Sequence, residues 1–432
     1  MAITETTEAR IEDASNILVA PAHLQGADVI QDFFGSVVTP EDLNSGSLDL
    51  AQKTVYLWGD VSGIDRRRLR RADRVFMVRE PAHGHHEDAE GDADAPWTLV
   101  DVGRVPIRVH GVGVYYRRFF EADADHFGRI SAEHAFQSLT ESTKPGTAHR
   151  SGIYLTPVTR EGDDLHFRLL RCSTNLSGPT EGFGPTDTHI VDDLNREGAT
   201  VFRGQAPLNH VLAQIYHNTL ATAERKQSKA RISSHADKTK DMPGNGVMAF
   251  CTFYDGLDKL RPLAEDAFDR GVKTTSGLTR LHFRLKDPAG GKEGGKEGGK
   301  EGGKEGGEEG NGAAAFPPQF TLTLYPGSVF FMPLSTNRLY THEIRPSTLD
   351  AGLLPTRLGY VVRCSNAEAV HKNGQTYLKA AGELVKLEPP TEAGMDDLRR
   401  LYAEENRTTS FIDYGSGFRF SMNTGDYLAP RI

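Results

Sequence analysis

Alternation of apolar and polar residues marks strands in the second half of the chain. Thr279–Lys286 (TRLHFRLK) and Gln319–Tyr325 (QFTLTLY) change polarity at nearly every position, as strands with one buried face do. More continuous apolar runs predict three further strands, at Val247–Tyr254, Ser328–Pro333 and Arg357–Cys364. Strands at this density, with a Pro-Gly turn at 326–327, favour a β-sandwich or a barrel.

Elsewhere the pattern is less regular. Gly152–Val158 and Leu165–Cys172 predict strands, whereas Ser131–Glu141 predicts a short helix. Pro207–Ala223 fits either a strand or a short helix. Two segments near the C-terminus look helical, Gln375–Lys386 and Met395–Glu405.

This mixture predicts an α+β protein. We expect an N-terminal α/β region over residues 1–200, a jelly-roll core over 201–390 on which it packs, and a C-terminal helical extension over 391–432. Residues 287–312 repeat GGKE, and such a glycine-rich stretch stays flexible because it cannot fill a core. Since strand patterns flank it on both sides, we interpret it as a long loop inserted within the core.

The composition is that of a soluble globular protein, with 38% hydrophobic and 25% charged residues in 432. The polar N-terminus has no apolar signal core, and no later window approaches a membrane span. Cys172, Cys251 and Cys364 show neither zinc spacing nor a disulfide pattern, which favours an intracellular location, nuclear or cytoplasmic. The net charge of −9 gives no support for nucleic-acid binding by the molecule as a whole.

One motif with possible chemistry is His-x-Asp, at His235 and Asp237. The motif alone is weak, because similar pairs occur within the acidic stretch His83–Ala95, which we interpret as a solvated loop. At a strand end, residues i and i+2 share a face, so both side chains could reach one ion. His342, after the strand pair 321–333, is the candidate third ligand. Two histidines and one carboxylate indicate a non-haem Fe(II) oxygenase, with zinc hydrolases as the competing class.

Such oxygenases fill the open positions on the metal with a keto acid and O2. A keto-dicarboxylate also needs an anchor for its distal carboxylate. Arg357 suits this role, because a guanidinium meets a carboxylate in a bidentate fork. Arg357 and Arg363 lie six residues apart in RLGYVVR and therefore share one face of a strand.

In this order, the motifs resemble the AlkB-like branch of the Fe(II)/2-oxoglutarate dioxygenases. That family's pattern is Asn-x-Tyr, His-x-Asp, a distal His and Arg-x5-Arg. The matching positions are Gln214, Tyr216, His235, Asp237, His342, Arg357 and Arg363, with Lys238 also as in the family. The chain departs from the pattern at Gln214, where the family has Asn, and at Glu343, where it often has Gly.

The resemblance covers roughly residues 206–364 and implies a double-stranded β-helix core. It implies an Fe(II) ion held by His235, Asp237 and His342, and 2-oxoglutarate held by Arg357, Arg363, Tyr216 and Gln214. The N-terminal half and the string HADKTKDMP are more similar to a TET-like group of algal and fungal enzymes that modify 5-methylcytosine in DNA. Some of that group use ascorbate in place of 2-oxoglutarate. The implied reaction oxidises a methyl group on 5-methylcytosine or on an N-methyl base.

Cations surround the His-x-Asp pair and could bind the phosphates of DNA or, less favoured, RNA. They are Arg225, Lys226, Lys229, Arg231, Lys238 and Lys240. Lys238, Lys240 and Asp241 are the candidate substrate contacts, because they directly follow the metal pair. A solvated loop explains the same charges equally well. Two further basic stretches, Arg66–Arg74 and Tyr115–Phe120, are interpreted as a helix face and as a strand with buried rings.

Two other functions remain open. The same chemistry could act on a small molecule or a protein side chain, in which case the basic residues have no role in substrate binding. Alternatively, the protein is a metal-free jelly-roll binding module in which His235 and Asp237 are structural. Turnover of 2-oxoglutarate with Fe(II) separates both enzyme hypotheses from the binding module.

Overall fold

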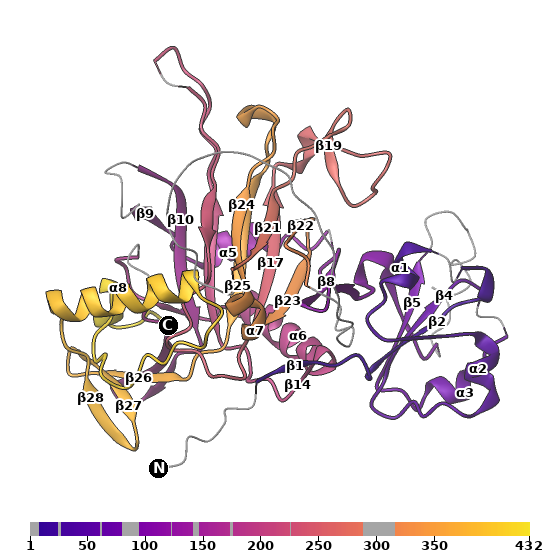
Figure 1. Cartoon of the computed structure of the whole chain (residues 1–432), viewed down its shortest axis with the longest axis horizontal. Coiled ribbons are helices and arrows are strands. Elements are labelled where there is room, and N and C mark those ends of the chain that lie inside the picture. The colour runs from indigo at the N-terminus through magenta and orange to yellow at the C-terminus, as the bar shows by residue number, and fades with distance from the viewer. Residues whose placement is uncertain are drawn as a thin grey trace, which may run out of the picture.

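Two β-sheets form the core of the molecule (Figure 1). The computed structural model describes residues 8–24, 27–60, 63–79, 95–121, 123–140, 147–172, 176–224, 226–287 and 316–432. The larger sheet has the order β13 (Glu181–Gly182), β10 (Thr147–Thr156), β15 (His210–Tyr216), β25 (Thr356–Arg363), β17 (Val247–Asp255), β23 (Val329–Pro333), β8 (Gly113–Tyr116) and β7 (Ile107–Val109), with β9 (Gln137–Thr140) paired to β10. The smaller sheet has the order β16 (Ile232–His235), β24 (Tyr340–Arg345), β21 (Arg280–Leu285) and β22 (Gln319–Thr323).

The chain passes repeatedly from one sheet to the other. β15, β17, β23 and β25 belong to the larger sheet, and β16, β21, β22 and β24 to the smaller one. Phe250 and Phe330 of the larger sheet share an apolar cluster with Phe283 and Tyr340 of the smaller one. The two sheets therefore pack as a jelly-roll-like sandwich, and the predicted α+β class and strand-rich core are confirmed.

Helices α5 (His126–Glu133) and α6 (Pro185–Val201) cover the other face of the larger sheet. Ile190 and Leu194 of α6 pack in one buried cluster with Ile153 of β10 and Val211 of β15. Since the larger sheet is buried on both faces, its strands have nearly continuous apolar runs. The smaller sheet has solvent on its outer face, which accounts for the alternation in β21 and β22.

A separate parallel sheet precedes the core. Its order is β3 (Ser36–Val38), β2 (Asn16–Val19), β4 (Thr54–Trp58), β5 (Arg74–Arg79) and β6 (Thr98–Asp101), with helices α1 (Asp28–Gln31), α2 (Pro40–Ser45) and α3 (Arg66–Leu69). It lies to one side of the core in Figure 1. Arg74 and Arg104 both contact the fully buried Glu197 of α6, at 2.8 and 3.3 Å. Strands within residues 107–182, which belong to the predicted N-terminal region, are part of the larger sheet together with β15, β17, β23 and β25.

Two element predictions are wrong. Gln375–Lys386 is not a helix but strands β27 (Gln375–Ala380) and β28 (Glu383–Lys386). Asn373-Gly374 and Ala381-Gly382 have positive φ at both residues, which is the geometry of two-residue hairpin turns. With β11 (Thr159–Glu161), β12 (Asp164–Leu169) and β26 (Ala367–Lys372), these strands form a five-stranded sheet. In Ser131–Glu141, helix α5 ends at Glu133 and β9 follows, so most of the predicted helix is absent.

The glycine-rich insertion connects two adjacent strands, as predicted. β21 and β22 are antiparallel neighbours, and Leu285 N donates to Pro318 O just before the gap between them. Residues 288–315 and 80–94, which include most of the insertion and of the His83–Ala95 stretch, lie outside the described residues.

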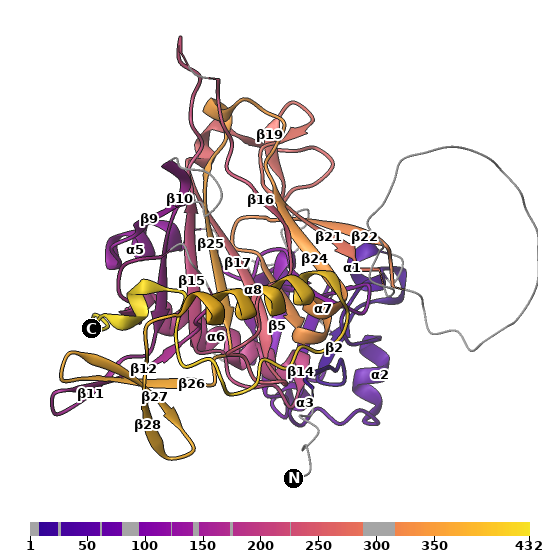
Figure 2. The same ribbon diagram turned by 60° about the vertical axis from the view of Figure 1, so that its left-hand side comes forward.

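Smaller elements complete the fold. β1 (Arg10–Ile11) pairs with β14 (Phe202–Arg203), and β18 (Arg261–Pro262), β19 (Arg270–Val272) and β20 (Thr275–Ser276) form a small sheet. Helix α7 (Leu334–Leu339) joins β23 to β24, and helix α8 (Glu392–Arg407), which includes the predicted Met395–Glu405, runs across the core strands in Figure 2. Within the described ranges, no helix combines the length and apolarity needed to cross a bilayer.

A buried histidine connects α5 to α6. His134 Nδ1 lies 3.1 Å from Glu181 Oε2, and its Nε2 lies 2.6 Å from Asp187 Oδ2. Burial alone would lower the pKa of His134, but the hydrogen bonds and charges of Asp187 and Glu181 raise it above 6.5. Tyr360 OH and Gly184 N donate to the Asp187 carboxylate as well. Protonated His134 therefore stabilises the fold below pH 6.5, and this contribution is lost as the pH rises through the raised folded-state pKa.

Replacing His134 by glutamine is expected to flatten this part of the pH dependence of stability. Urea unfolding between about pH 6 and about pH 9 should show the free energy of unfolding falling less steeply than in the wild type. His189→Gln, at an exposed histidine of α6, is the matched control and should keep the wild-type slope. A wild-type slope in His134→Gln would contradict the assignment.

Candidate metal centre

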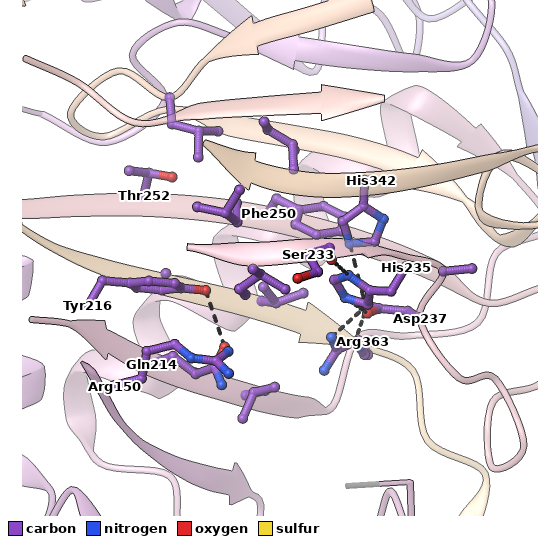
Figure 3. Close-up of a pocket in the computed structure, with 18 of the residues that line it drawn as sticks. Arg150, Gln214, Tyr216, Ser233, His235, Asp237, Phe250, Thr252, His342 and Arg363 are labelled. Atoms are coloured by element: carbon purple, nitrogen blue, oxygen red, sulfur yellow. Dashed lines mark hydrogen bonds and ion pairs between the residues drawn. The ribbon is translucent and has the colours of Figure 1, made fainter. Parts of the chain in front are cut away.

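Two adjacent strands of the smaller sheet bring the two histidines together (Figure 3). β16 pairs with β24, and His235 stands opposite His342 in that pairing. Side chains directly opposite on neighbouring strands share a face of the sheet. Asp237 follows His235 by two residues, just beyond the end of β16. The strand register thus explains why residues more than one hundred positions apart in the sequence meet here.

The three side chains converge closely. The ring centroids of His235 and His342 are 4.5 Å apart. Oδ1 of Asp237 lies 3.5 Å from His235 Nε2 and 4.0 Å from His342 Nε2. One ligand atom from each residue lies within 4.8 Å of the others. Atoms that share one ion through bonds of about 2.1 Å are roughly 3–4 Å apart, so small adjustments suffice for the three to hold one ion.

The protonation states of the imidazoles suit metal binding. His235 Nδ1 lies 2.9 Å from the carbonyl oxygen of Ser233, and a carbonyl can only accept. In a neutral ring the proton is therefore on Nδ1, which leaves the Nε2 lone pair directed at Asp237. Burial, with a smaller effect of His235, lowers the pKa of His342 to about 3. The neutral ring of His342 and the Nδ1-protonated tautomer of His235 each offer a nitrogen lone pair.

Arg363 orients the carboxylate of Asp237 by binding the oxygen that does not face the histidines. Its Nη2 and Nε lie 2.6 and 3.1 Å from Asp237 Oδ2. Oδ1 remains directed at the two imidazoles. Burial would raise the pKa of Asp237, but the positive charge of Arg363 outweighs this effect and, with smaller contributions of the two histidines, holds this pKa well below 3.8. Arg363, predicted to hold 2-oxoglutarate, is thus engaged with the metal-site aspartate in this structure.

A cavity of about 440 Å³ extends from the three residues between the sheets. Arg357, Tyr216 and Gln214 line it, as do Thr252 and Arg150. Tyr216 OH lies 3.3 Å from Gln214 Oε1, and Figure 3 shows this pair away from the histidines. All the predicted metal and cosubstrate residues therefore line one cavity.

Arg357 is a buried cation that no carboxylate of the described residues neutralises. It is 5% exposed, its Nε has no hydrogen-bond partner, and it forms no ion pair with any described residue. Its guanidinium lies 4.0 Å above the Tyr216 ring centroid. A Cβ at Gly359 would lie 3.0 and 3.1 Å from the two terminal guanidinium nitrogens, so the glycine makes room for them. Because a buried charge without a partner is costly, the position of Arg357 in the cavity favours binding of an anionic group.

Several residues of the site were not predicted from the sequence. Thr252 lines the cavity, and its buried hydroxyl has no hydrogen-bond partner among the described residues. Thr252 and Tyr254 are the two hydroxyl residues of the otherwise mostly apolar strand β17. A small polar residue within such an apolar run could have indicated a functional position. Arg150 comes from β10, which sequence patterns assigned to the N-terminal region. Asn337 and Asn406 contact the loop that carries Asp237, and no motif marks them.

The three predicted substrate contacts lie in different environments. Lys238 lines the cavity, but its Nζ is 3.2 Å from Cys172 O and 4.4 Å from the Tyr402 ring centroid. Lys240 and Asp241 do not line it. Asp241 receives hydrogen bonds from the Arg171 guanidinium at 2.6 and 3.1 Å and from Lys240 Nζ at 3.0 Å. This buried charge cluster occupies both residues, so their positions give no support to a role in substrate binding.

The remaining basic residues divide between structural and exposed positions. Lys229 Nζ donates to Ser347 O at 2.9 Å, whereas Lys226 and Arg231 are exposed, and Arg225 lies outside the described residues. In Arg66–Arg74, the first four residues form α3, as the helix interpretation expects. All four rings of Tyr115–Phe120 are buried, which excludes them as a stacking platform for bases.

Comparisons with known proteins give little beyond this geometry. No family model and no curated protein matches the sequence. Among solved structures, the chain is similar to a bsmA homolog from Methylobium petroleophilum PM1, with 12% identity over 56% of this chain and 82% of that chain, at a TM-score of 0.26. It is also similar to SnoN, a non-heme alpha ketoglutarate dependent epimerase from nogalamycin biosynthesis, with 14% identity over 63% of this chain and 88% of that chain, at a TM-score of 0.26. With TM-scores this low, the argument for function rests on the site itself.

Proposed function

We propose that the protein is an Fe(II)-dependent dioxygenase that uses 2-oxoglutarate and O2. The observation that carries this proposal is a single cavity that contains two different kinds of binding group. At one end, two imidazoles and one carboxylate converge on a point. Elsewhere in the same cavity, Arg357 offers a buried guanidinium that no described anion neutralises. A 2-oxo dicarboxylic acid has the matching groups, a chelating end for a metal and a distal carboxylate for an arginine.

The strand order supports this class. Apart from β18, β19 and β20, the strands from β15 to β25 form two four-stranded sets with the orders β15-β25-β17-β23 and β16-β24-β21-β22, and the chain changes sheet at every step except between β21 and β22. We interpret this arrangement as a double-stranded β-helix. In it, the strand pair β16 and β24 supplies the two histidines, and β25 supplies both arginines.

The donor set favours iron. Two histidine nitrogens and one carboxylate oxygen on one side of an ion are the ligands of non-haem Fe(II) oxygenases, and they leave positions open for cosubstrate and O2. A catalytic zinc site with the same ligand types remains the competing assignment. When bound, Fe(II) would supply the activation of O2 that couples oxidative decarboxylation of the 2-oxo acid to oxidation of a C–H bond.

The protein's own residues have separate tasks in this scheme. Arg357 would bind the distal carboxylate, and the Thr252 hydroxyl lies in the same cavity as a further donor. Tyr216 supports the guanidinium through its ring face. Arg363 keeps Asp237 ionised and oriented. Residues of both sheets line the cavity that holds these groups.

The unpaired Arg357 also favours 2-oxoglutarate over ascorbate. A bidentate fork matches the planar geometry of a carboxylate, which ascorbate lacks. Ascorbate as cosubstrate therefore remains the second candidate. A metal-free binding module is less consistent with the site, because it gives no role to the convergence of His235, Asp237 and His342 on one point.

For the substrate, we propose a methylated base in DNA. The support is local charge near the cavity: Arg150 lines it without an ion pair to any described residue, and Arg231 is exposed directly before the lining residues of β16. Two cations placed in this way could contact the phosphates that flank an extruded base. Hydroxylation of a small molecule or of a protein side chain uses the same site without those contacts.

The proposal is tested by turnover. Purified protein with Fe(II), 2-oxoglutarate, O2 and methylated DNA should form succinate and a changed nucleoside profile, both measured by mass spectrometry. The same incubation with ascorbate replacing 2-oxoglutarate distinguishes the cosubstrates. Absence of succinate and of nucleoside change in every combination would remove the DNA dioxygenase assignment, whereas succinate without nucleoside change would move the substrate to another class.

A further inference from the structure

The loop that carries Asp237 is held by side chains from outside the metal-binding strands. Asn337 Oδ1 accepts from Asp237 N at 2.8 Å, and its Nδ2 donates to Asp237 O at 2.8 Å. Both halves of one side-chain amide thus bind both backbone groups of one residue. Asn337 is 1% exposed, so water does not compete for these hydrogen bonds.

A second asparagine holds the preceding residue. Asn406 Oδ1 accepts from Ala236 N at 2.6 Å. Asn406 belongs to α8, which follows the last core strand by almost thirty residues. On the other side of Asp237, Glu405 of the same helix accepts from the backbone N and the hydroxyl of Thr239, at 3.2 and 2.5 Å. Helix α8 therefore forms hydrogen bonds with the residues on both sides of Asp237.

The position of Asn337 links two of the metal-site residues. It lies in α7, which continues directly into β24, and His342 is five residues further along the chain. Asp237 lies beyond the end of β16, so the pairing of β16 with β24 does not fix its position. The two hydrogen bonds of Asn337 therefore fix the position of the Asp237 backbone relative to His342. Without these contacts, the backbone of Ala236 and Asp237 would lose its side-chain partners, and the loop would depend on the ion pair of Asp237 with Arg363 and on the contacts of Thr239 with Glu405.

We propose that Asn337 and Asn406 are positioning residues, which hold the Asp237 loop in its metal-binding conformation before the ion arrives. This inference rests on the proposed metal site. Outer partners that orient metal ligands typically contribute about 10–100-fold to metal affinity, because each hydrogen bond reduces the conformations that binding must exclude. The two asparagines act on the backbone of the loop and touch no reacting atom.

The test is the affinity for Co(II), which does not need O2 or cosubstrate to bind. Isothermal titration calorimetry of the full chain should show binding about 10–100-fold weaker in Asn337→Ala and about 10-fold weaker in Asn406→Ala. The visible absorption bands of bound Co(II) should also change, since they report the geometry of the ligands. Asn245→Ala is the matched control, because Asn245 donates to a backbone carbonyl, that of Gly204, in an exposed loop.

Two aspartate variants separate hydrogen bonding from charge and from simple loss of folding. In Asn406→Asp, a carboxylate oxygen can accept the same hydrogen bond from Ala236 N, so affinity should return close to that of the wild type. In Asn337→Asp, one oxygen would face the Asp237 carbonyl in place of the Nδ2 donor, so affinity should stay low. If added negative charge were the only effect, both variants would bind Co(II) more tightly. Thermal unfolding of each apo variant shows whether the fold is retained.

The outcomes are distinct. Equal Co(II) affinity and equal spectra in the wild type, both alanine variants and Asn337→Asp would overturn the positioning role. Absence of Co(II) binding in the wild type would instead overturn the proposed metal site, and the positioning role with it. Weak binding in Asn337→Asp together with recovery in Asn406→Asp would support the inference.

Discussion

Asp237→Ala is expected to abolish 2-oxoglutarate turnover and to destabilise the folded protein. The substitution removes the carboxylate that faces both imidazoles, so metal affinity should fall by more than the roughly 10–100-fold typical of outer partners. It also leaves Arg363 buried without its counter-ion. Removing one partner of a buried ion pair costs about 3–5 kcal/mol in free energy of unfolding. Succinate formation and urea unfolding of the apo protein measure the two effects separately.

His342→Gln is the matched variant for this prediction. It also removes a metal ligand, but it leaves no charge unpaired, because burial keeps His342 neutral, with its pKa lowered to about 3. We therefore expect the same loss of turnover with a smaller loss of stability. Full turnover in either variant would contradict the assignment of the metal centre. Equal stability losses in the two variants would contradict the role given to Arg363.

Arg357→Ala is expected to raise the KM for 2-oxoglutarate strongly and to leave Co(II) affinity unchanged. Truncating one partner of a buried hydrogen-bonded charge pair costs about 2–5 kcal/mol, which corresponds to about 30-fold to about 4,000-fold in affinity. The apo protein should be no less stable than the wild type, because the substitution removes a buried cation that has no anion. Loss of cosubstrate binding without loss of stability would distinguish a binding residue from a structural one.

A chemical control sharpens this test. A 2-oxo acid without a distal carboxylate, such as 2-oxobutyrate, cannot use Arg357, so its weak turnover should be the same in the wild type and in Arg357→Ala. Gly359→Ala should also raise the KM for 2-oxoglutarate, because its Cβ would lie 3.0–3.1 Å from the guanidinium nitrogens. Equal KM values for 2-oxoglutarate in the wild type and Arg357→Ala would show that the distal carboxylate binds elsewhere.

The N-terminal half contributes a strand and a cavity-lining side chain to the candidate site, which its sequence pattern did not indicate. Strand β10 extends the larger sheet past β15 and places Arg150 in the cavity. Helix α8, near the C-terminus, contributes Asn406 to the lining of the same cavity. The candidate site is thus assembled from three distant parts of the chain, and the eight strands of the two four-stranded sets form only its central part.

Sequence patterns predicted the parts of the fold in which local chemistry and final environment agree. The strands Val247–Tyr254, Ser328–Pro333 and Arg357–Cys364 are present, because runs of this length and composition are stable only when buried in a sheet. Strands β27 and β28 were predicted as a helix from a weak periodic pattern. Two turns contradict that pattern, Asn373-Gly374 between β26 and β27 and Ala381-Gly382 between β27 and β28.

By itself, the sequence determined which residues could form a metal site, since His-x-Asp, a distal histidine and spaced arginines are local or ordered features. It did not determine what each residue contacts. Only the tertiary structure paired Arg363 with Asp237, placed Arg357 in a cavity away from any carboxylate of the described residues, and buried Lys240 with Asp241 and Arg171. These outcomes depend on burial and on contacts between distant strands, because the same charge is harmless in water and costly in a low-dielectric interior unless a partner lies within reach.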